Sequence, residues 1–75
     1  MKTISHALNE LYLANEEPGE LEIRVENAIE ILQDGLDSLG CQMASAEVAD
    51  LIQKLNNGED IEPIIFELEV INNEL

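Results

Sequence analysis

The sequence predicts an all-α fold, a small four-helix bundle, on three observations. The chain has 75 residues, the length of one small domain. Its hydrophobic fraction of 45% is ordinary for a globular protein, with one Phe, one Tyr and no Trp. Apolar residues recur at steps of three and four along four segments, which is the periodicity of amphipathic helices. We therefore expect residues 1–75 to form a single acidic helical domain.

The first predicted helix covers Ser5 to Asn15, and Thr3 is a candidate N-cap. The sequence "EEPGE" then ends the pattern, because Pro18 and Gly19 favour a turn. The predicted apolar stripe of this helix consists of Ile4, Ala7, Leu8, Leu11 and Tyr12.

The second predicted helix is the longest and ends before Gly40, a candidate C′ residue. Its first residues also alternate apolar and polar, as an exposed strand would. The alternation fails by Ala28, whereas the helical spacing continues, so helix is preferred. The predicted stripe consists of Leu21, Val25, Ala28, Ile29, Leu32, Leu36 and Leu39.

The third predicted helix follows the short connection "CQMA", with Ser45 as its N-cap and Gly58 just past its end. Its stripe consists of Val48, Leu51, Ile52 and Leu55. Both boundaries and the spacing agree on a helix.

The fourth predicted helix begins at Asp60 or Ile61, and Pro63 is acceptable in its first turn. Its stripe consists of Ile61, Ile64, Ile65, Leu68 and Ile71. Apolar and acidic residues also alternate within 66–70, so the alternative is a strand over residues 64–71 and an α+β fold. With the helix, the four elements predict an up-and-down or orthogonal bundle.

The net charge of −14 is unevenly distributed along the chain. Residues 16–40 carry eight acids and one base, and residues 59–75 carry six acids and no base. A basic face for DNA, RNA or anionic membranes is therefore excluded, so neither nucleic acid nor membrane is an expected direct partner. A salt-adapted surface would spread its acids evenly, and this chain does not.

No pattern of catalytic or metal-binding residues is found. His6 and Glu10 share a helix face, but two ligands are too few for a metal site. A calcium loop centred on Gly58 fails at two ligand positions. There is no glycine-rich phosphate loop and no nucleophile motif, so we expect no enzyme, no metal and no cofactor.

Cys41 is the single cysteine, so no internal disulfide forms and a free thiol is expected. The N-terminus lacks the features of a signal peptide, and no segment approaches the ~20 apolar residues of a membrane span. We expect a soluble, cytoplasmic protein.

A row of carboxylates on the second helix is the candidate functional feature. These acids follow one another at steps of four, and like charges at that spacing destabilise a helix. A solvated face usually mixes both signs, whereas this row is acidic throughout. Two isoleucines are expected on or beside the same arc, away from the core. The predicted partner-binding residues are Glu22, Glu26, Glu30, Asp34, Asp37, Ile23 and Ile31.

Two functions are consistent with these residues. In size, charge and lack of a catalytic motif, the chain resembles the small acidic proteins that phages use against restriction or CRISPR machinery. The resemblance implies an inhibitor that blocks the nucleic-acid site of a basic protein or nucleoprotein complex, as a DNA mimic. The alternative is a helical adaptor, antitoxin or immunity-type partner that binds through an apolar patch containing Ile23, Ile31, Phe66 or Val70. A homodimer through Phe66 and Val70 also stays open.

Overall fold

The computed structural model describes residues 2–39 and 45–74, with the side chains of residues 2, 37–39 and 45 left out of the description. Within these ranges the chain forms four α-helices, one 3-10 turn and no strand. The elements are α1 (Lys2–Glu16), η1 (Pro18–Glu20), α2 (Leu21–Leu39), α3 (Ser45–Asn56) and α4 (Ile61–Glu74). The all-α prediction is confirmed. The strand alternative for residues 64–71 is wrong, because these residues lie inside α4.

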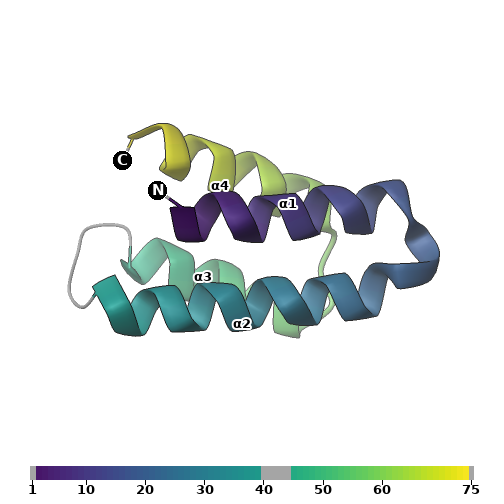
Figure 1. The fold of residues 1–75 in the computed structure, drawn as a ribbon, viewed down its shortest axis with the longest axis horizontal. Coiled ribbons are helices and arrows are strands. Elements are labelled where there is room, and N and C mark those ends of the chain that lie inside the picture. The colour runs from purple at the N-terminus through teal and green to yellow at the C-terminus, as the bar shows by residue number, and fades with distance from the viewer. Residues whose placement is uncertain (1, 40–44, 75) are drawn as a thin grey trace.

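The helices form an up-and-down bundle of 35 × 20 × 18 Å (Figure 1). Each helix has two neighbouring helices, in the cyclic order α1, α2, α3, α4, while no Cα atoms of the diagonal pairs come within 8 Å among the described residues. The α1–α2 pair is the most extensive contact, and α3–α4 is the least. The start of α1 and the end of α4 lie at the same end of the bundle (Figure 1).

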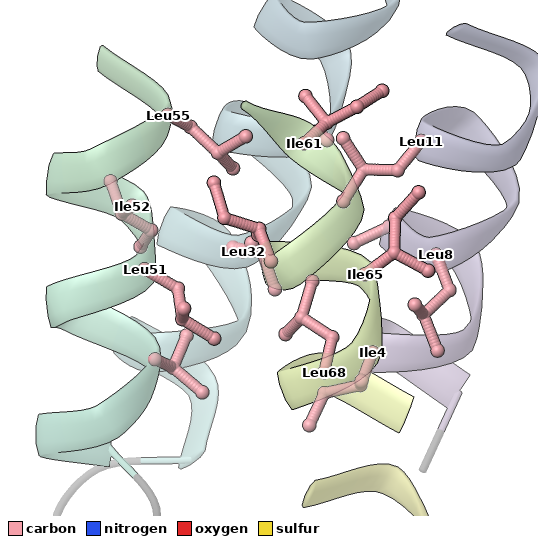
Figure 2. Close-up of a cluster of buried hydrophobic side chains, with 14 of the residues drawn as sticks. Ile4, Leu8, Leu11, Leu32, Leu51, Ile52, Leu55, Ile61, Ile65 and Leu68 are labelled. Carbon is pink, nitrogen blue, oxygen red and sulfur yellow. The ribbon is translucent and has the colours of Figure 1, made fainter. Parts of the chain in front are cut away.

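The core is entirely aliphatic, and its side chains converge from all four helices (Figure 2). Each fully buried Leu or Ile contributes about 1.5–3 kcal/mol relative to an exposed one. No polar or charged side chain is buried among those described. The buried residues are Ile4, Ala7, Leu8, Leu11, Ala14, Ala28, Leu32, Val48, Leu51, Ile52, Leu55, Ile61, Ile64, Ile65, Leu68 and Ile71.

The predicted stripes of α3 and α4 are confirmed in full. In α1, Tyr12 is 40% exposed rather than buried, and Ala14 joins the core instead. In α2, Leu21 is 40% exposed because it opens the helix at the edge of the bundle. The central part of the α2 stripe packs as predicted, with Val25, Ile29 and Leu36 partly buried against the core.

The contact between α1 and α2 depends on a glycine. A Cβ at Gly35 would collide with the Thr3 methyl group. Glycine inside a helix costs about 1 kcal/mol relative to alanine, and here it allows close approach of the two helices. Thr3 lies within α1, which begins at Lys2, so the prediction that Thr3 caps the helix is wrong.

The connections follow the turn residues. The Glu20 N–H donates to the Glu17 carbonyl at 2.9 Å, which closes η1 directly before α2. At the end of α3, Gly58 has φ +76°, a left-handed conformation that favours glycine. The Gly58 N–H donates to the Leu55 carbonyl at 3.1 Å, as in a Schellman cap. The predicted end of α3 is therefore confirmed.

Some predictions lie outside the described residues. These are Gly40 as a C′ residue and the "CQMA" connection with Cys41. The capping side chain of Ser45 and the side chain of Leu39 belong to the same group. In the two described ranges, no helix is both long and apolar enough to cross a membrane.

Candidate functional site

The acidic ridge, defined as Glu22, Glu26, Glu30 and Asp34, lies on the outer face of α2. All four side chains are exposed. Each step of four residues rises about 6 Å and turns about 40° around the helix, so the ridge spans about 18 Å and turns about 120°. No hydrogen bond or ion pair joins these carboxylates to any other side chain that the structure describes. The ridge is therefore available to a partner.

The neighbours of the ridge differ from one another in burial. Ile23 is 62% exposed and lies three residues before Glu26, on the same face. Ile31 is partly buried and packs against the core, so the prediction that it lies away from the core is wrong. It precedes Gly35 by one turn, on the side of α2 that α1 covers. Asp37 belongs to α2, but its side chain lies outside the description.

The positive charge near α2 is used inside the fold. Arg24 Nη1 lies 3.2 Å from Glu10 Oε1, and Arg24 Nη2 lies 3.1 Å from Glu20 Oε1. Asn27 Nδ2 donates to Glu10 Oε1 at 2.9 Å. This bond, aided by Arg24, holds the pKa of Glu10 below its ordinary value. Arg24 thus ties α2 to α1 and to η1, and it leaves the ridge carboxylates unneutralised.

An apolar groove borders the first turns of the ridge, at the junction of α2, α3 and the start of α4. It has a volume of about 310 Å³. Glu22 and Glu26 stand at its edge, so carboxylates and apolar side chains meet at one place. Its apolar lining consists of Leu21, Val25, Ile29, Leu55 and Ile61. Sequence reasoning missed this groove, because it depends on how three separate helices meet, and the spacing within one helix carries no signal for that.

A second apolar surface lies on α4. Phe66 is 65% exposed and Val70 is 41% exposed, and we call this pair the α4 crest. On one side of the crest, a groove of about 580 Å³ separates α4 from α3, and we call it the α3–α4 groove. On the other side, the crest borders α1, where the Tyr12 hydroxyl donates to a Glu69 carboxylate oxygen. That hydrogen bond raises the pKa of Tyr12.

The described side chains contain no group of three or more His, Cys, Asp or Glu that could hold a metal ion. His6 is exposed on α1.

No family model, curated protein or solved structure matches this chain. The candidate functional surfaces are therefore those of the chain itself, the acidic ridge on α2 and the α4 crest.

Proposed function

We propose that this chain is a non-catalytic acidic inhibitor that binds a basic, nucleic-acid-binding protein and blocks its nucleic-acid site. The observation that carries the proposal is the acidic ridge, whose carboxylates are exposed and unpaired among the described side chains. A protein that acts as a nucleic-acid mimic would need such a row of free negative groups. Phage anti-restriction or anti-CRISPR activity is the setting in which such an inhibitor would act.

The spacing of the ridge supports partial mimicry of a phosphate backbone. Ridge carboxylates follow one another at about 6 Å along the axis, whereas one DNA strand places a phosphate every ~3.4 Å. The ridge is therefore less dense in charge than a nucleic acid. It would engage a subset of the Lys and Arg side chains that hold phosphates, and the bulk of the bundle would block the rest of the site.

The apolar neighbours of the ridge would add contact energy that salt does not screen. Ile23 and the groove beside Glu22 and Glu26 place apolar surface next to the carboxylates. A partner that carries both basic residues and an apolar patch matches this combination. Burial of apolar area would hold the complex, while the net charge of −14 would speed association.

Affinity capture with matched variants tests the proposal. The ridge variant replaces Glu22, Glu26, Glu30 and Asp34 by Gln, Gln, Gln and Asn. The control variant removes four exposed acids elsewhere: Glu16, Glu17, Glu62 and Glu74, each replaced by Gln. Each protein is immobilised and exposed to a bacterial lysate at physiological ionic strength, and bound proteins are then eluted with higher salt or with duplex DNA.

The expected result is that nucleic-acid-binding proteins bind the wild type and the control variant and are released by salt and by DNA. The ridge variant should lose them, because the Debye length of ~8 Å limits the effect of charges elsewhere on the surface. Capture that survives in the ridge variant, or that duplex DNA does not compete away, would contradict the proposal.

The second candidate function is a helical adaptor, antitoxin or immunity-type protein that binds through an apolar patch. The exposed α4 crest favours it, because the single Phe of the chain is on the surface rather than in the core. Under this function, Phe66→Ala would abolish capture and the ridge variant would preserve it.

A further inference from the structure

We propose that the α3–α4 groove binds a basic amphipathic α-helix of a partner protein. The inference rests on the second candidate function, whose surface it shares, and it is independent of the acidic ridge. The ridge lies on the outer face of α2, and α2 and α4 are diagonal in the bundle, so the two surfaces face different ways.

The groove exists because α3 and α4 are the most loosely packed pair of neighbours in the bundle. The four-residue connection at 57–60 joins them at one end of the bundle (Figure 1). Leu51 and Ile71 form its floor, while Phe66 and Val70 form one wall. The apolar surface that water reaches in the groove comes mainly from Phe66 and Val70, because Leu51 and Ile71 are buried, and its burial by a partner is favourable.

The shape of the groove suits a helix. α3 contributes positions 46, 47, 50 and 51, and α4 contributes positions 66, 67, 70 and 71. Both walls thus present the same spacing over about one and a half turns, or roughly 8 Å along each helix. A third helix laid along the groove would place side chains at i, i+3, i+4 and i+7 between these rows, as in helix-in-groove recognition.

The charge around the groove selects a basic helix. Glu47 and Asp50 line it from α3, and Glu67 lines it from α4. Lys54 lies 3.5 Å from Asp50 as an ion pair, so this base offsets one of the three acids. Lys or Arg flanking the apolar face of the incoming helix would meet Glu47 and Glu67, and acidic partners would be repelled.

Charge also argues against a second copy of the chain as the occupant. A symmetric dimer through this groove would bring Glu47 and Glu67 of one chain close to the same residues of the other. Each chain carries a net charge of −14, so this contact would be repulsive. A basic helix is the occupant that satisfies both the apolar floor and the acidic rim.

The test uses three synthetic peptides of about 18 residues, long enough to form helix. The probe peptide has Leu on one face and Lys on its flanks. One control peptide keeps the Lys residues and replaces Leu by Gln, and the other keeps Leu and replaces Lys by Glu. Affinity is measured at physiological ionic strength by fluorescence anisotropy, and the site is mapped by amide chemical shifts of the labelled protein.

We expect only the probe peptide to bind, with the largest shifts in residues 46–51 and 66–71. The double variant Phe66→Ala, Val70→Ala should weaken binding at least about tenfold. The matched control Leu21→Ala, Ile23→Ala, which truncates two exposed side chains on α2, should change affinity less than about twofold. Circular dichroism confirms that each variant folds.

Three results would overturn the inference: no binding of the probe, equal binding of the Leu-free peptide, or shifts centred on α2. The ridge variant separates this inference from the inhibitor function. If the groove binds the helix, the ridge variant retains the probe peptide, whatever the lysate capture shows.

Discussion

The two sides of α2 differ in the burial of their apolar side chains and in the pairing of their charges. On the inner side, Leu32 is buried, Arg24 is paired with Glu10 and Glu20, and Gly35 allows α1 to approach. On the outer side, the acidic ridge has no ion pair among the described side chains, and Ile23 is exposed. The difference shows that, in α2, ion pairs and buried apolar side chains are found on the side that contacts the rest of the fold. On α2, the described carboxylates that lack an ion pair lie on the face that does not pack against the core.

Truncating one apolar side chain on each side of α2 should give the largest difference in the free energy of unfolding. Leu32→Ala should lower the free energy of unfolding by about 2–5 kcal/mol, because it leaves a cavity among aliphatic neighbours. Ile23→Ala should change it by about 0.5 kcal/mol or less, because the side chain is mostly in water. Urea denaturation followed by circular dichroism measures both. Similar losses in the two variants would mean that the outer face also supports the fold.

Neutralising the ridge should stabilise the protein. Its four residues form three like-charge pairs at steps of four, and each such pair costs about 0.2–0.5 kcal/mol. The ridge variant should therefore gain roughly 0.6–1.5 kcal/mol in the free energy of unfolding at low salt. The gain should shrink in high salt, where wild-type repulsion is screened. A lower thermal midpoint for the variant would mean that the ridge carboxylates stabilise the fold, contrary to this prediction.

The smallest effect is expected at Glu10 of α1, which pairs with Arg24 on the inner side of α2. Its pKa is lowered in the folded chain from an ordinary value of 4.5, mainly by the Asn27 hydrogen bond. The carboxylate therefore adds stability above pH 4.5, and this contribution is lost as the pH falls through the lowered pKa. Glu10→Gln should cost about 0.3–1 kcal/mol at pH 7, in the range of exposed ion pairs.

Unfolding of the wild type and the Glu10→Gln variant across pH 7 to pH 2 measures this difference. The two curves should converge at the acid end. A difference that grows as the pH falls would mean that the carboxylate destabilises the fold.

The elements and most of the core were predictable from the sequence, because helical spacing depends on local order. α3 and α4 show this most clearly, since every residue of their predicted stripes is buried. Tyr12 and Ile31 were not predictable. Periodicity gives the arc on which a side chain lies, but the neighbouring helix decides whether that arc is covered.

The candidate surfaces were also predictable only in part. Exposure of the ridge followed from its position opposite the stripe of α2. The two grooves depend on how far separate helices diverge, and the contact of Thr3 with Gly35 joins residues far apart in the sequence. Such features arise from packing between elements, which spacing within one element does not determine.

Tyr12 gives the molecule a built-in optical reporter. The chain contains one Tyr and no Trp, so its ultraviolet fluorescence comes mainly from this ring. The Tyr12 hydroxyl donates to Glu69, and the ring shares a surface with Phe66 and Val70. A molecule that covers the α4 crest should therefore alter the emission without any attached dye, whereas one that covers only the outer face of α2 should leave it unchanged.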